Sequence, residues 1–141
     1  MNRLMILVVE DNDDSRALYD LVLSRAGFEV KGAGDSEAAL EMLDDLQPDL
    51  LITDIHMPNL SGIDLIRHIR ADEKWTSLPI IAVTAFGPDQ LALAATQGAT
   101  RVLRKPFEPN RLLSIVFELT KKVRARSTGY HDPGLKFGSD G

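Results

Sequence analysis

The stretch that decides the fold is Leu50–Gly62, which reads Leu-Leu-Ile-Thr-Asp-Ile-His-Met-Pro-Asn-Leu-Ser-Gly. Its opening run is apolar and short, as in a strand that is buried on both faces of a parallel sheet. The run ends at Asp54, after which Pro58 and Gly62 favour a loop. Ligands of open parallel sheets bind beyond the carboxyl ends of the strands, so Asp54 stands where such a fold does its chemistry.

The composition indicates one soluble domain. A chain of 141 residues has the usual length of a single domain, and its net charge of −5 argues against general attraction to nucleic acids or anionic membranes. The absence of cysteine excludes disulfides and thiolate sites. The N-terminal apolar run is too short for a signal peptide, and the sequence contains no apolar run of about 20 residues that could span a bilayer. We expect a cytoplasmic protein.

Five short apolar runs alternate with five segments of helical pattern. Because right-handed crossovers place helices on both faces of a parallel sheet, this alternation predicts a doubly wound α/β fold. The second strand is expected at an edge of the sheet, since its alternation is only partial. The predicted strands are 4–9, 28–33, 50–53, 79–83 and 102–103; the helices are 13–26, one closed by Pro48, 61–71, 88–97 and one that begins at Pro109.

The first predicted helix has a clear start and stop. Asn12 or Asp13 can cap its first turn, and Gly27 is placed to end it in a left-handed conformation. Its apolar side chains predict the face that packs on the sheet. That predicted inward face consists of Ala17, Leu18, Leu21, Val22 and Leu23.

Polar side chains follow four of the predicted strands. Glu10 and Asp11 follow the first, Asp54 ends the third, Thr84 the fourth and Lys105 the fifth. If these strands are neighbours, the side chains converge on one pocket. Each pair of its three carboxylates would repel by roughly 3 kcal/mol at about 5 Å and an effective dielectric constant of about 20. Such a cluster needs a cation, and carboxylate oxygens suit Mg²⁺.

These groups match the needs of phosphoryl transfer. An aspartate such as Asp54 can attack phosphorus to give an acyl phosphate. The Lys105 ammonium and the Thr84 hydroxyl would stabilise charge on the transferring oxygens. Taken alone, Glu10 and Asp11 are ordinary acids at a helix start and Lys105 an ordinary loop lysine. Their common position at strand ends favours the functional interpretation.

Four pieces of the sequence resemble one known family. They are Val9-Glu10-Asp11, Asp54 with Met57-Pro58 and Gly62, Val83-Thr84-Ala85, and Lys105-Pro106-Phe107. In this order the chain resembles the receiver domains of two-component response regulators from about residue 4 to residue 123. The resemblance implies a flavodoxin-like (βα)5 fold with the strand order 2-1-3-4-5.

The resemblance also implies a magnesium site. Asp11, Asp54 and the backbone carbonyl of His56 would coordinate the ion, and Glu10 would assist through water. No organic cofactor is implied.

The same resemblance assigns the phosphoryl group. Asp54 would accept it from the phosphohistidine of a sensor histidine kinase or a histidine phosphotransfer protein. Thr84 and Lys105 would contact the phosphoryl oxygens, and the Lys105–Pro106 peptide bond would be cis.

One position departs from the family pattern, and two nearby side chains have roles that the sequence leaves open. Many receivers carry an aromatic residue three positions before the lysine, where this chain has Val102, which leaves the usual aromatic switch in question. Phe86 is either a substitute reporter of phosphorylation or a shield for the site. The His56 side chain is either an exposed loop residue or lies over the phosphoryl group and changes how fast water reaches it.

The expected function is a switch driven by phosphorylation, in a signalling domain rather than an enzyme. The alternative is a magnesium-dependent phosphohydrolase with an aspartyl-phosphate intermediate, although the chain has no room for a cap domain. The expected partners are the kinase or phosphotransfer protein and a downstream output protein or domain, without direct contact to nucleic acid or membrane; the oligomeric state is left open.

The end of the chain has a different composition. Residues 1–124 are expected to form the receiver domain, and residues 125–141, rich in Gly, to be an unstructured tail, a linker or a cloning remnant. Tyr130 and Phe137 are candidates for docking this segment on the domain. The chain is either a stand-alone regulator or a receiver cut from a longer protein.

Overall fold

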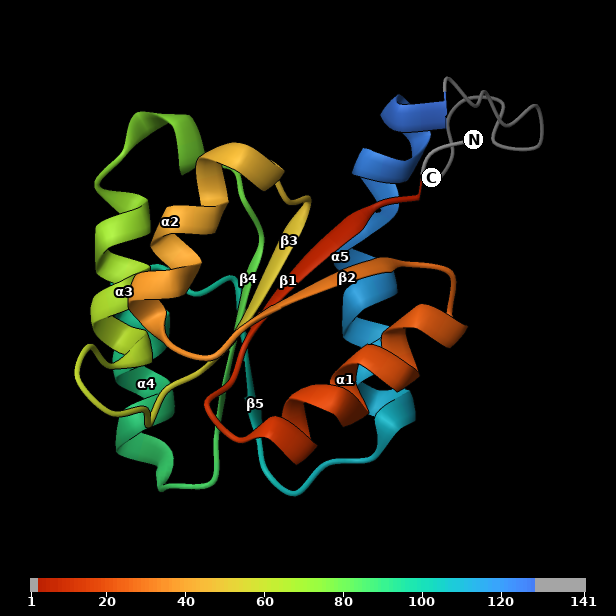
Figure 1. Ribbon diagram of the computed structural model, residues 1–141. Helices are drawn as coiled ribbons and strands as arrows, with labels where there is room; N and C mark the ends of the chain where they lie inside the picture. Colours follow the sequence, from red (N-terminus) through yellow and green to blue (C-terminus); the bar gives the residue numbers. More distant parts are fainter. Residues whose placement is uncertain (1–2, 129–141) are drawn as a thin grey trace.

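The computed structural model describes residues 3–128, and their side chains as far as residue 121. Its centre is a five-stranded parallel sheet in the order β2-β1-β3-β4-β5, which confirms the predicted order (Figure 1). Within the described residues β2 is an edge strand, as expected. The strands are β1 (Met5–Val9), β2 (Glu29–Ala33), β3 (Leu50–Asp54), β4 (Ile80–Thr84) and β5 (Arg101–Arg104).

Helices cover both faces of the sheet. Figure 1 shows α1 (Asp13–Arg25) and α5 (Pro109–Thr128) together on one side. On the other side lie α2 (Ser36–Leu46), α3 (Gly62–Arg70) and α4 (Pro88–Gln97). A short 3₁₀ helix, Glu73–Trp75, precedes β4. Among the described residues, no helix combines the length and apolar character needed to cross a membrane.

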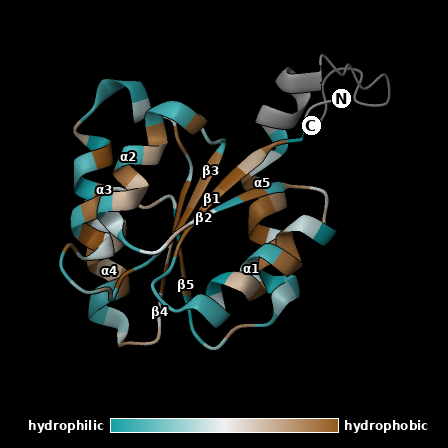
Figure 2. Ribbon diagram, viewed as in Figure 1, coloured by the Kyte–Doolittle hydropathy of each residue, from teal (hydrophilic) through white to brown (hydrophobic). Residues whose placement is uncertain are grey.

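Each face of the sheet has its own hydrophobic core. Alternate residues of the buried strands point to opposite sides, so Val8 and Ile52 pack toward α1 and α5, whereas Val9 and Leu51 pack toward α2, α3 and α4. β1 and β3 accordingly appear among the most hydrophobic parts of the chain in Figure 2. Burial on both faces is the reason that β1, β3 and β4 are almost continuously apolar in sequence.

Side-chain caps begin three of the helices. The Asn12 carboxamide oxygen accepts the Ser15 N–H at 2.8 Å, which resolves the predicted alternative of Asn12 or Asp13 in favour of Asn12. Asp35 caps α2 and Ser61 caps α3 in the same way. These caps satisfy N–H groups that have no partner inside the helix.

The predicted inward face of α1 is wrong in part. Tyr19 and Leu23, one turn apart, are the buried residues, whereas Leu18 and Leu21 are 60% and 49% exposed. The five apolar residues of the prediction span too much of the helix circumference to face the sheet together. The larger Tyr19 ring takes the inward position and packs near Phe107, with 6.3 Å between ring centroids.

The predicted domain boundary at residue 124 falls inside a helix. α5 continues to Thr128, so residues 125–128 are helical instead of belonging to an unstructured tail. The helical pattern stops being apolar before the helix ends, which explains the early boundary. Residues 129–141, with Tyr130 and Phe137, lie outside the described residues.

Candidate functional site

Strand register brings the predicted site residues to one edge of the sheet. Val9 is the partner of Thr53 across β1 and β3, so the residues that follow, Glu10 and Asp54, end neighbouring strands. On the other side, Asp54 is the partner of Val83 in β4. The predicted convergence of Glu10, Asp11, Asp54 and Lys105 is therefore present in the structure.

Three carboxylates form the centre of the site. Glu10, Asp11 and Asp54 each offer an oxygen atom, and these atoms all lie within 4.8 Å of one another. Glu10 is only 2% exposed, whereas Asp11 is open to solvent. Hard oxygen ligands at this spacing suit a divalent cation such as Mg²⁺. The donor set fits a metal site, and the cation would offset the repulsion between the acids.

Lys105 joins two of these acids. Its Nζ lies 3.0 Å from Asp54 Oδ2 and 3.3 Å from Glu10 Oε1. Burial by itself would lower the lysine pKa, but the contacts with Asp54 and Glu10 outweigh it and raise the pKa. The Lys105–Pro106 peptide bond is cis, as the resemblance implies.

Glu10 has an unusual environment for a carboxylate. Burial raises its pKa above the ordinary value of 4.5, and the charge of Asp54 acts in the same direction. A hydrogen bond from the Asn12 N–H to Glu10 Oε2, at 3.1 Å, and the nearby Lys105 partly oppose this shift. A nearby cation would offset the cost of burying the Glu10 charge.

Thr84 ends β4, and His56 follows Asp54 by two residues. Thr84 is fully buried at the end of β4, and its hydroxyl oxygen accepts the Phe86 N–H at 3.0 Å, which leaves the hydroxyl proton to donate. The His56 N–H donates to Asp54 Oδ1 at 3.3 Å. The roles of the Thr84 hydroxyl toward a phosphoryl group and of the His56 carbonyl toward a metal ion stay predictions.

Gly62 allows the loop after β3 to return to its own start. A Cβ atom at this position would overlap the Asp54 carbonyl oxygen and lie 2.8 Å from Ile55 Cα. The Gly62 N–H also donates to the Ile55 carbonyl at 2.8 Å. The close approach of two main-chain segments therefore requires glycine here and fixes the backbone that carries Asp54.

Sequence reasoning missed two features of the site. The His56 imidazole and the Phe86 ring are in contact, with centroids 3.9 Å apart. Arg16 donates from Nη1 to the Glu10 carbonyl at 2.7 Å. No sequence motif signals either contact, because each joins a side chain to a loop or turn whose path only the fold sets.

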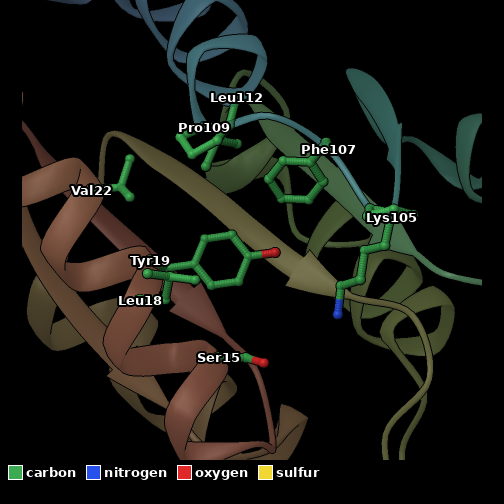
Figure 3. A pocket seen from close by; sticks show the side chains of 9 residues that line it. Ser15, Leu18, Tyr19, Val22, Lys105, Phe107, Pro109 and Leu112 are labelled. Atoms are coloured by element: carbon green, nitrogen blue, oxygen red, sulfur yellow. The ribbon is translucent and has the colours of Figure 1, made fainter.

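A cavity of about 270 Å³ opens on the other side of Lys105 (Figure 3). It lies between α1 and the segment that joins β5 to α5, and its walls are mostly apolar. Burial raises the pKa of the Tyr19 hydroxyl in this cavity, and the charges of Glu10 and Asp54 add to the effect. The lining residues are Ser15, Leu18, Tyr19, Val22, Lys105, Pro106, Phe107, Pro109 and Leu112.

Comparison with known proteins agrees with this geometry. The family model described as the response regulator receiver domain matches residues 6–117. The DNA-binding response regulator MtrA of Mycolicibacterium smegmatis is 35% identical over 125 residues, which are 88% of this chain and 50% of MtrA. The phosphate regulon transcriptional regulatory protein PhoB of Escherichia coli is 30% identical over 119 residues, 84% of this chain and 52% of PhoB. This chain thus spans about half the length of each.

Solved structures show the same fold. The chemotaxis protein CheY4 of Vibrio cholerae superposes with a TM-score of 0.78 at 28% identity, over 84% of this chain and 99% of CheY4. A response regulator receiver protein from Pseudomonas putida gives a TM-score of 0.77 at 35% identity, over 84% of this chain and 98% of that one.

Proposed function

The chain belongs to the family of response regulator receiver domains, which are phosphoacceptor modules of two-component signalling and not catalytic enzymes; on that premise we propose that Asp54 is its phosphoacceptor. The observation that carries the proposal is the position of Asp54 at the end of β3, 3.0 Å from Lys105 and beside Glu10 and Asp11. Its side chain is 11% exposed, so the carboxylate is not fully closed off from a donor.

The transfer follows from these positions. A carboxylate oxygen of Asp54 attacks the phosphorus of a phosphohistidine, the P–N bond breaks, and the imidazole leaves with the bonding electrons and takes up a proton. The product is an acyl phosphate on Asp54. Lys105 contacts Asp54, and after transfer its ammonium group would pair with the phosphoryl oxygens. The Thr84 hydroxyl would donate a hydrogen bond to the same oxygens.

We propose Mg²⁺ as the metal of the site. Asp11, Asp54 and the His56 carbonyl would hold it, with Glu10 acting through water. The ion would supply positive charge that neutralises the acids and the incoming phosphoryl oxygens. The spacing of the three carboxylates supports this assignment.

The family implies a histidine kinase as partner. We propose that this kinase, or a histidine phosphotransfer protein, is the donor, and that a downstream protein or domain reads the phosphorylated state in the cytoplasm. The net charge of −5 supports an output by protein contact, without direct binding of nucleic acid or membrane by this domain. MtrA is described as DNA-binding, but this chain matches only 50% of MtrA, so DNA binding is not carried over to it.

Incubation with acetyl phosphate and Mg²⁺ tests the proposal. We expect one phosphoryl group per chain, measured by intact mass, and none in Asp54→Asn or in the presence of EDTA. The matched control is Asp44→Asn, which changes an exposed acid that pairs with Lys74 far from the site. Turnover on many phosphate esters, without a stoichiometric acyl phosphate, would instead indicate the phosphohydrolase alternative.

A further inference from the structure

Hydrogen bonds to the main chain of Glu10 hold the turn that carries Glu10 and Asp11. The Glu10 N–H donates to the Ala33 carbonyl at 3.0 Å, and the Glu10 carbonyl accepts from Arg16 Nη1 at 2.7 Å. This carbonyl belongs to the peptide that joins Glu10 to Asp11. Its orientation therefore sets the direction in which the Asp11 side chain leaves the chain. Since Asp11 is exposed, neighbouring side chains do little to fix it by packing.

Arg16 is itself held in place from two sides. Its Nη2 pairs with Asp13 Oδ1 at 2.5 Å, within the first turn of α1. Its aliphatic stem lies over Gly32 of β2, where an added Cβ would come within 2.9 Å of Arg16 Cδ and 3.2 Å of Cγ. Arg16 thus occupies the space that a side chain at position 32 would need. With 27% of its side chain exposed, Arg16 is largely packed.

We propose that Arg16 is a positioning residue for the metal site, acting through the Glu10–Asp11 peptide. The inference rests on the proposed function, in that it requires a divalent ion at Glu10, Asp11 and Asp54. A guanidinium that donates to a carbonyl makes a short, charge-assisted hydrogen bond, which is suited to fixing a peptide plane. Partners that orient metal ligands in this way commonly change metal affinity by about 10-fold to 100-fold.

Because Arg16 is positively charged, a positioning role and simple charge repulsion have opposite effects on Mg²⁺ affinity. A positive side chain near the site repels Mg²⁺, so removing it should tighten binding if charge is all that matters. Removing a positioning contact should weaken binding. The two explanations therefore predict changes of opposite sign for Arg16→Met.

Calorimetric titration of the full chain with MgCl₂ provides the measurement. We expect Arg16→Met to bind Mg²⁺ about 10-fold more weakly than wild type. Arg16→Lys keeps one donor for the Glu10 carbonyl, so we expect it to recover part of the affinity. The matched control is Arg67→Met, because Arg67 makes the same kind of contact with Asp64, at 2.8 Å and three residues apart, in α3. Its affinity should equal that of wild type.

A second variant reaches the same contact from the β2 side. Gly32→Ala forces the Arg16 stem to move, so Mg²⁺ binding should again weaken. In a double-mutant cycle, Gly32→Ala should have no further effect once Arg16 is Met, since both changes disturb the same hydrogen bond. Melting curves in EDTA show whether each variant is folded before metal is added.

The inference is overturned if Arg16→Met binds Mg²⁺ as tightly as wild type, or more tightly, while remaining folded. It is also overturned if the effects of Arg16→Met and Gly32→Ala simply add. A wild-type chain that binds no Mg²⁺ at all would instead contradict the proposed function, so the two failures are distinguishable.

Discussion

The His56 imidazole and the Phe86 phenyl ring lie 3.9 Å apart between centroids, with their planes tilted by 50°. His56 comes two residues after Asp54 and Phe86 two residues after Thr84, so the pair bridges the loops that follow β3 and β4. Phe86 is 55% exposed, although it is a large apolar side chain. The His56 end of the pair lies next to the acceptor, because the His56 N–H donates to Asp54 Oδ1 at 3.3 Å.

We predict that His56→Asn changes the lifetime of the acyl phosphate on Asp54. If the imidazole, in contact with Phe86, hinders the approach of water to the acyl phosphate, the asparagine side chain should shorten the lifetime about two-fold to ten-fold. The decay of phosphorylated protein after removal of acetyl phosphate gives the rate. His68→Asn, on the exposed face of α3, is the control. Equal lifetimes in His56→Asn and wild type would contradict this role of the His56 side chain.

Phe86→Ala tests whether Phe86 reports phosphorylation in place of the missing aromatic residue at position 102. If it does, the amide shifts that a phosphoryl mimic causes in β5 and α4 should shrink in the variant. Amide spectra with and without beryllofluoride make the comparison. Leu21→Ala, which removes another exposed apolar side chain but lies in α1, outside the two elements compared, serves as the control. A full wild-type pattern of shifts in Phe86→Ala removes this residue from the switch.

Asp54→Asn should stabilise the metal-free domain and weaken Mg²⁺ binding. Relief of repulsion from Glu10 and Asp11 contributes about 6 kcal/mol, at roughly 5 Å and an effective dielectric constant near 20. Loss of the Lys105 contact at 3.0 Å costs about 5 kcal/mol on the same scale, which leaves a net gain of about 1 kcal/mol. Urea unfolding in EDTA measures the difference. A lower free energy of unfolding in Asp54→Asn contradicts the repulsion.

The raised pKa of Glu10 predicts a pH dependence of stability. Burial is the main cause of the shift, followed on the raising side by Asp54. Between the ordinary value of 4.5 and the higher folded value, the folded protein holds a proton that the unfolded chain has released. The free energy of unfolding in EDTA should therefore fall as pH rises through this window. Glu10→Gln removes this part of the slope; the same slope in both proteins would assign it to other groups.

Gly62→Ala should destabilise the domain by about 3 kcal/mol, because its Cβ would overlap the Asp54 carbonyl oxygen and main-chain atoms cannot move aside cheaply. Gly87→Ala is the matched control, since a Cβ there meets nothing within 4 Å. Thermal unfolding compares the two. Equal melting temperatures for both variants would show that the loop after β3 relaxes freely.

Much of this protein is determined by its sequence alone. Short, continuously apolar strands must be buried on both faces, and their alternation with helices leaves a parallel sheet as the solution. Acids and a lysine placed at the strand ends then meet at one edge, which is why Glu10, Asp11, Asp54 and Lys105 could be predicted as one cluster. Gly27 likewise marked the end of the first helix, and the structure gives it the positive φ of 102° that glycine tolerates.

Tertiary structure alone decided the contacts that depend on how elements pack. The inward face of α1 is set by the fit of Tyr19 beside Phe107, and not by the number of leucines on the helix. Arg16 reaches the Glu10 carbonyl because Gly32, on a different strand, leaves room for its stem. Such contacts join residues whose distance and direction follow from helix and sheet packing, so residue types and spacing carry no signal for them.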